Sequence, residues 1–196
     1  MRKNTPKRAW YIINGITLYR VVAAPFLLVL LFTGQYDIFK WLLGVSFFTD
    51  LIDGYLARKY KVASVIGTRL DSLGDDLTVL VAVVGLFVMK PEYIKQEKIF
   101  FIILLILFLI QVGYAFIRYK KMTGFHTWLA KTAALLQGVF LLLVFFTDEP
   151  IMFLFYAAIF ITMLQLIEEI ILVALLPKWE TNVKGLYWVL KNKAVK

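Results

Sequence analysis

The chain has 196 residues and no cysteine; 61% of the residues are hydrophobic, 18% are charged, and the formal net charge is +9. Soluble domains carry about 45–50% apolar and about 25% charged residues, so the composition excludes an ordinary soluble enzyme and a disordered chain. Without cysteine there are no disulfides or thiolate chemistry, and the single histidine, His126, argues against histidine-rich metal sites. The positive charge indicates basic loops facing an anionic lipid surface rather than a nucleic-acid patch.

Six apolar segments separated by polar turns predict an all-α fold: a polytopic membrane protein with six transmembrane helices in one domain, residues 1–196. The segments lie at residues 16–34, 38–57, 67–89, 98–118, 128–147 and 151–176. The first is interpreted as a retained span, because its apolar run exceeds the roughly 7–15 residues of a signal-peptide core. Residues 1–15 are expected to lie along the membrane surface, and residues 177–196 to form a cytoplasmic tail.

The basic residues predict the orientation of these spans. With the N-terminus in the cytoplasm, most of the 22 Lys and Arg residues fall on the cytoplasmic side, as the positive-inside rule requires. The exceptions are Lys40, Lys90, Lys95 and Lys98. An even number of spans returns the C-terminus to the cytoplasm. The absence of a recognisable targeting segment fits a prokaryotic inner membrane, which is the expected location, with the active site facing the cytoplasm.

Two pairs of carboxylates stand at the ends of the second and third predicted spans. Asp50 and Asp53 are three residues apart, and Asp71 and Asp75 are four apart, so each pair lies on one helix face. The short loop between the spans predicts an antiparallel hairpin in which the two pairs meet near the cytoplasmic surface. A carboxylate costs about 2.5–3.5 kcal/mol near the centre of a membrane helix and less toward its ends. Four of them require compensating cations.

Hard divalent ions with oxygen ligands would supply that compensation: Mg²⁺, Mn²⁺ or Ca²⁺. Four carboxylates are enough for two ions, paired ions suit phosphoryl transfer, and one carboxylate would remain able to take a proton. Two other interpretations stay open. The acids would be helix caps or ion-pair partners of Arg58 and Arg69, or they would form the acidic ion relay of a small membrane transporter.

Small residues and an arginine accompany the acids. Gly54 and Ala57 lie one turn apart, and Gly67 precedes the second acidic pair. Small residues allow close helix packing, and they equally allow a flat base or a diphosphate to approach the backbone. Arg58 follows directly and is suited to bidentate binding of a phosphate.

The stretch from Asp50 to Asp75 resembles the signature of the CDP-alcohol phosphatidyltransferases, and every signature position is matched. The pattern is Asp50-x2-Asp53-Gly54-x2-Ala57-Arg58-x8-Gly67-x3-Asp71-x3-Asp75. The resemblance implies transfer of a phosphatidyl group from a CDP-lipid, CDP-diacylglycerol, to an alcohol with release of CMP. It also implies that the four acids bind two divalent metal ions, Mg or Mn, and that Asp75 is the general base that deprotonates the acceptor. The resemblance further implies a homodimer.

The same resemblance gives roles to the other signature residues. Gly54, Ala57 and Gly67 would shape the cytidine pocket, and Arg58 would hold the nucleotide phosphates. In the first span, Asn14, Thr17 and Arg20 are spaced as in phosphatidylglycerophosphate-synthase-like members, so Asn14 and Thr17 are further CDP-binding candidates. The alternative for these two is ordinary helix capping.

The acceptor is the least determined part of the prediction. Arg118 and Lys131 stand at the ends of two apolar segments and are candidates for binding a phosphate on the acceptor. Glycerol 3-phosphate is therefore the first acceptor predicted, and an inositol phosphate the second. The Glu168-Glu169 pair lies within the last span and has no assigned role. At least one of the two glutamates is expected to face inward and to pair with a polar group.

Overall fold

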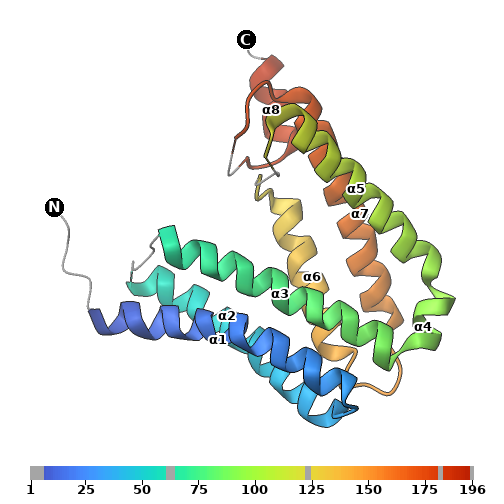
Figure 1. Cartoon of the computed structure of the whole chain (residues 1–196). Coiled ribbons are helices and arrows are strands. Elements are labelled where there is room, and N and C mark those ends of the chain that lie inside the picture. The colour runs from blue at the N-terminus through green and yellow to red at the C-terminus, as the bar shows by residue number, and fades with distance from the viewer. Residues whose placement is uncertain (1–6, 61–64, 122–124, 181–182, 195–196) are drawn as a thin grey trace. The chain divides into compact units, whose positions relative to one another are not determined.

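The computed structural model describes the backbone of residues 7–60, 65–121, 125–180 and 183–194. It describes the side chains of residues 15–50, 52, 74–121, 125–180 and 183–191. These residues form helices and no strands (Figure 1). The helices are α1 Lys7–Phe32, α2 Tyr36–Tyr60, α3 Val65–Met89, α4 Pro91–Gln96, α5 Lys98–Tyr119, α6 Trp128–Leu143, α7 Met152–Leu175 and α8 Leu186–Ala194.

The all-α fold class is confirmed for the described residues, and each predicted apolar segment coincides with a helix. Within them, Gly15–Phe32, Lys98–Tyr119 and Met152–Leu175 are long and apolar enough to cross a membrane. Helix α6 is shorter than predicted and ends at Leu143, which gives it a length of about 24 Å. Helix α1 begins at Lys7, within the predicted surface segment. Helices α4 and α8 were not predicted.

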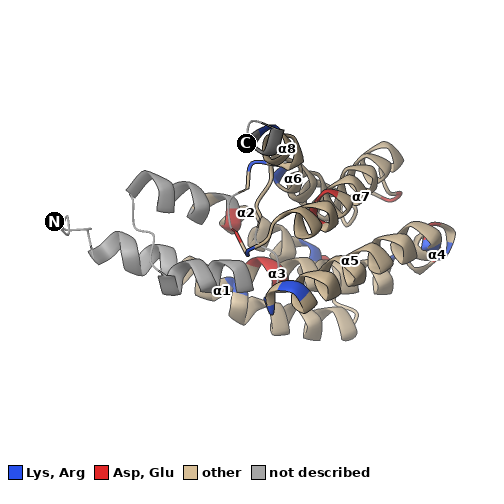
Figure 2. Cartoon of the chain, turned by 90° about the horizontal axis from the view of Figure 1, so that it is seen from above, with Lys and Arg blue, Asp and Glu red and all other residues tan. Residues whose placement is uncertain are grey.

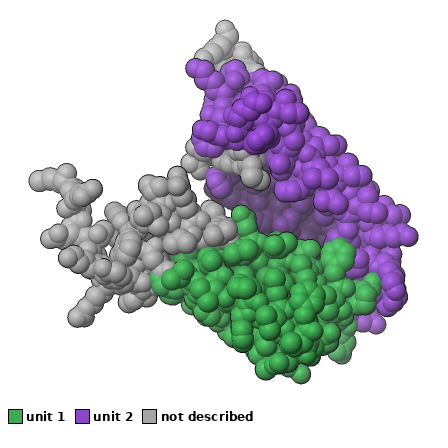
Figure 3. All heavy atoms as spheres, viewed as in Figure 1, with its two compact units in different colours: residues 1–91, 141–148 green, residues 92–140, 149–196 purple. Residues whose placement is uncertain are grey.

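The chain divides into two compact units, which Figure 3 colours separately. Unit 1 comprises residues 1–91 and 141–148, and unit 2 comprises residues 92–140 and 149–196. The two pairs of signature acids belong to unit 1.

Unit 1 is built around α1, which packs against both α2 and α3. The buried positions of α1 recur every three or four residues, as expected of one helix face: Thr17, Arg20, Ala23, Ala24, Leu27, Leu30 and Leu31. Gly34 ends the helix with a positive φ of 74°, and the backbone amides of Gly34 and Gln35 donate to carbonyls of the last turn. This glycine cap directs the chain straight into α2.

The end of α6 explains why the fifth apolar segment is not helical throughout. Helix α6 stops at Leu143, and the amides of Phe146 and Thr147 fold back onto the carbonyl of Leu143. The Lys90 ammonium then donates to the carbonyls of Thr147, at 3.0 Å, and Asp148, at 2.6 Å. A charged donor therefore satisfies carbonyls that a longer helix would have paired internally.

Unit 2 is built on the pairing of α5 with α7. Helix α8 also contacts α7. The core of unit 2 contains a cluster formed by Ala115, Phe125, Leu172, Val173, Leu176 and Val183. The phenol of Tyr119 donates to the carbonyl of Leu176 at 2.8 Å, at the end of α7. Leu186 and Val189 of α8 pack against the same cluster. The remaining faces of α5 are apolar and exposed, for example Ile106, Leu109 and Ile117, as expected of helices that contact lipid.

We predict that Gly85→Ala lowers the melting temperature of the chain in detergent. A Cβ atom at Gly85 would lie 2.7 Å from Phe39 Cζ and 3.2 Å from Phe145 Cζ. The two rings are buried and pack edge to face, so neither can yield easily. We expect a loss of about 1–3 kcal/mol from overpacking, read from thermal unfolding.

Gly113→Ala is the matched control. Gly113 also lies within a helix, and a Cβ atom added to it would have no other side chain within 4 Å. Helix propensity alone then predicts a gain of up to about 1 kcal/mol. Equal melting temperatures for the two variants would contradict the packing of α3 against Phe39.

Candidate active site

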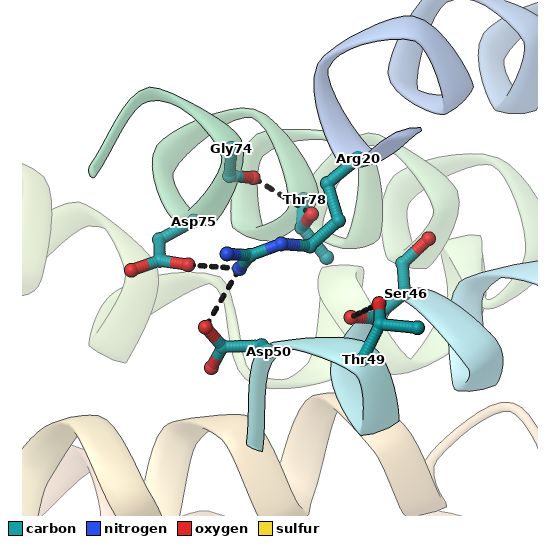
Figure 4. A network of polar contacts seen from close by, with 7 residues as sticks. All are labelled: Arg20, Ser46, Thr49, Asp50, Gly74, Asp75 and Thr78. Carbon is teal, nitrogen blue, oxygen red and sulfur yellow. Dashed lines mark hydrogen bonds and ion pairs between the residues drawn. The ribbon is translucent and has the colours of Figure 1, made fainter. Parts of the chain in front are cut away.

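Arg20 lies in the core of unit 1, with 1% of its surface exposed. Its Nη1 donates to Asp50 Oδ1 on α2 at 2.7 Å and also to Asp75 Oδ1 on α3. Figure 4 shows the guanidinium between the two carboxylates. One buried cation of α1 therefore binds acids of the two helices that follow it, and the predicted meeting of the two acidic spans is confirmed for Asp50 and Asp75.

Gly74 lets α3 approach the arginine closely. A Cβ atom at Gly74 would lie 3.4 Å from Arg20 Cβ, 3.5 Å from Nε and 3.6 Å from Cζ. These are ordinary contact distances, so alanine would fit, whereas a longer side chain would have to displace the guanidinium. The arginine therefore contacts α3 at Gly74 and binds the carboxylates of Asp75, on the same helix, and Asp50, on α2 (Figure 4).

The acids and the arginine differ sharply in exposure. The side chain of Arg20 is 0% exposed, whereas those of Asp50 and Asp75 are 41% and 44% exposed. Nearby hydroxyls bond to their own helices, since Thr78 donates to the Gly74 carbonyl at 2.8 Å and Ser46 to the Leu42 carbonyl at 3.1 Å. The carboxylates of Asp50 and Asp75 are therefore accessible to solvent, whereas the guanidinium that they bind is buried.

Several predicted site residues have side chains outside the described part of the chain. They are Asn14, Asp53, Gly54, Ala57, Arg58, Gly67 and Asp71. Their roles stay predictions. Thr17 is described: it is 2% exposed and lies one turn before Arg20 on the buried face of α1.

Asp50 and Asp75 have the chemistry of a site for hard divalent ions, because carboxylate oxygens are the donors such ions prefer. Among the described side chains, no three acidic or histidine residues gather closely enough to hold a metal ion. The two remaining signature acids lie on the same helices, Asp53 one turn after Asp50 and Asp71 one turn before Asp75. The donor types therefore fit a divalent cation.

The predicted acceptor residues belong to unit 2. Arg118 is exposed in the last turn of α5. Lys131 is exposed near the start of α6, where its ammonium lies 5.0 Å from the centre of the Trp128 ring. The structure therefore gives Lys131 an aromatic neighbour that its place in the sequence did not reveal.

Glu168 and Glu169 form a second polar group, on α7, which Figure 2 marks in red. Glu169 is 8% exposed and accepts hydrogen bonds from Gln111 at 2.8 Å and Gln165 at 2.7 Å. Glu168 accepts a hydrogen bond from the backbone amide of Leu186, at 2.9 Å, where α8 begins. The expectation that one glutamate faces inward and pairs with a polar group is confirmed. These contacts join α5, α7 and α8.

Sequence reasoning assigned Arg20 only a place in a motif and missed its contact with the acids. A signal was present, because a charged residue within an apolar span requires a partner of opposite charge. Because Arg20 requires an anionic partner and the four signature acids require cations, the sequence contained enough information to predict that they pair.

A family model for CDP-alcohol phosphatidyltransferases matches residues 10–176, and the chain belongs to that family. The match covers most of α1 and all of the helices from α2 to α7, and it includes the site just described. No solved structure matches the chain significantly.

Curated relatives match over shorter segments. The chain is 35% identical over 79 residues to a CDP-diacylglycerol–glycerol-3-phosphate 3-phosphatidyltransferase of Cereibacter sphaeroides, covering 38% of the chain and 36% of that protein. It is 33% identical over 84 residues to a CDP-diacylglycerol–inositol 3-phosphatidyltransferase of Saccharomyces cerevisiae, covering 43% and 38%. It is 31% identical over 78 residues to a human CMP-forming cardiolipin synthase, covering 39% and 26%. The matches thus span well under two thirds of these relatives.

We predict that the site tolerates Gly74→Ala but not Gly74→Leu. The alanine methyl group fits against Arg20, whereas leucine forces the guanidinium away from the carboxylates. We expect Gly74→Leu to cost about 1–3 kcal/mol through overpacking, with further loss if an ion pair breaks. Thermal unfolding of both variants in detergent measures the difference. A Gly74→Leu chain as stable as the alanine variant would contradict the close approach.

Proposed function

We propose that the chain is a membrane phosphatidyltransferase of phospholipid synthesis. It transfers the phosphatidyl group of CDP-diacylglycerol to an alcohol and releases CMP. The observation that carries the proposal is that Asp50 and Asp75, from two helices, bind the same guanidinium and remain accessible to solvent. Family membership and the printed names of the relatives support the same reaction. They favour it over a transporter with an acidic ion relay.

The four signature acids are proposed to hold two divalent ions, Mg or Mn. Bound there, the ions would neutralise the diphosphate and stabilise the departing CMP. Asp75 takes the proton of the acceptor hydroxyl. The hydroxyl oxygen then bonds to the phosphorus of the phosphatidyl group as the bond from that phosphorus to CMP breaks.

The nucleotide is proposed to lie beside the acids. Arg58 binds its phosphates through a bidentate contact, and Asn14, Thr17, Gly54, Ala57 and Gly67 line the cytidine pocket. Of these residues, Thr17 is described, and its burial one turn before Arg20 on α1 supports the assignment.

Arg118 and Lys131 are proposed to bind a phosphate on the acceptor. Both are exposed cations, which suits an anionic, water-soluble substrate. Glycerol 3-phosphate is the first candidate, in line with the name of the bacterial relative. An inositol phosphate is the second.

The proposed setting is a six-span protein of a prokaryotic inner membrane, functioning as a homodimer. Both termini and the active site face the cytoplasm. The distribution of Lys and Arg and the three long apolar helices support this arrangement.

We predict that Asp75→Asn abolishes CMP release, because asparagine can neither take the acceptor proton nor provide an anionic oxygen. The assay uses purified protein, CDP-diacylglycerol and Mg²⁺ or Mn²⁺, with glycerol 3-phosphate, inositol phosphate, serine, inositol or choline phosphate added separately. Loss of at least about 10³-fold is expected.

Asp76→Asn is the matched control, since Asp76 is the exposed neighbour on the same helix and lies outside the signature. It should retain CMP release. Full activity of a folded Asp75→Asn chain would refute the site. No CMP release by the unchanged chain with any of the five acceptors would refute the proposed substrates.

A further inference from the structure

We propose that Arg20 is the resident counter-ion of the acidic site: it holds Asp50 and Asp75 in place before any metal ion binds. It thereby sets how strongly a divalent cation stabilises the fold. This inference rests on the proposed function, because it takes the signature acids as the ligands of that cation.

The acidic site concentrates negative charge around Arg20. Asp50 and Asp75 are brought onto one guanidinium, and two further acids stand one turn away on the same helices. Two carboxylates that bind the same guanidinium nitrogen are close enough to repel one another. An arginine remains protonated at any physiological pH, so Arg20 offsets part of this repulsion permanently.

The arginine is buried, but the carboxylates that it binds are reached by solvent. The side chain of Arg20 is 0% exposed, whereas both acids are more than two-fifths exposed. The backbone of α3 at Gly74 encloses the guanidinium at contact distance. A cation arriving from solvent therefore meets carboxylates that are already oriented, and it need not displace the arginine.

A purely structural ion pair would produce the same contacts, so the test must depend on more than stability. If Arg20 acts as a counter-ion, a chain without it has more unneutralised negative charge at the site. A divalent cation then removes more repulsion than it does in the unchanged chain. The stabilisation caused by the cation should increase, even though the metal-free chain is less stable.

The experiment compares Arg20→Met with Arg20→Lys, which keeps the positive charge but not the planar fork. Each full-length protein is stripped with chelator in detergent and melted with and without Mg²⁺. For Arg20→Met we expect a lower metal-free melting temperature. We also expect a Mg²⁺-induced rise roughly twice that of the unchanged chain. Arg20→Lys should respond to Mg²⁺ much as the unchanged chain does.

The outcomes separate the inference from the proposed function. An equal or smaller Mg²⁺-induced rise in Arg20→Met than in the unchanged chain overturns the counter-ion role while leaving the metal site standing. No rise in any of the proteins, including the unchanged chain, overturns the metal site and the inference with it.

A second comparison needs no metal. It tests the counter-ion role of Arg20 even if Arg20→Met folds poorly. Asp50→Asn should lower the metal-free melting temperature when Arg20 is present, since it breaks an ion pair. Added to Arg20→Met, the same change should raise the melting temperature or the yield of folded protein, since it removes a repelling charge. A loss in both backgrounds would contradict the proposal.

Discussion

An arginine taken out of water needs anionic partners, because a buried and unpaired charge costs several kcal/mol. Arg20 meets that requirement with carboxylates from two other helices, and this pairing links α1, α2 and α3 at one point. The small residue Gly74 lets α3 come close to Arg20, so that the pairing can form. The same requirement fixes where Asp50 and Asp75 lie, and so where the proposed chemistry of unit 1 would take place.

The charged side chains of the two units have different partners. In unit 1 the carboxylates are neutralised by a cation and remain accessible, which suits a site that exchanges ligands. In unit 2 the buried carboxylate of Glu169 accepts hydrogen bonds from Gln111 and Gln165, and Glu168 binds the backbone at the start of α8. The acids of both units therefore connect helices, and those of unit 1 are in addition partly exposed to solvent.

The sequence predicted the long helices well, because a run of about 20 apolar residues leaves the backbone few alternatives to a helix in lipid. It was less accurate where contacts between side chains and backbone decide the outcome. The end of α6 at Leu143 depends on the ammonium of Lys90, which is distant in the sequence. Helices α4 and α8 are short, and α8 gains its stability from packing and from Glu168, which no periodic pattern reveals.

For the site, the spacing of the acids and the short loop between the spans were sufficient to predict that α2 and α3 bring Asp50 and Asp75 together, and the resemblance to a family signature suggested a reaction. The contacts of Arg20 depend on the packing of α1, α2 and α3 together, so no local sequence pattern could predict them. The most direct measurement of the proposed metal site is a Mn²⁺ titration of the purified chain, with bound ions counted by electron paramagnetic resonance. Two bound ions per chain are expected, and both should be lost when Asp50 and Asp75 are changed together to Asn. A chain that binds no Mn²⁺, or a double variant that binds as much as the unchanged chain, would contradict the proposed site.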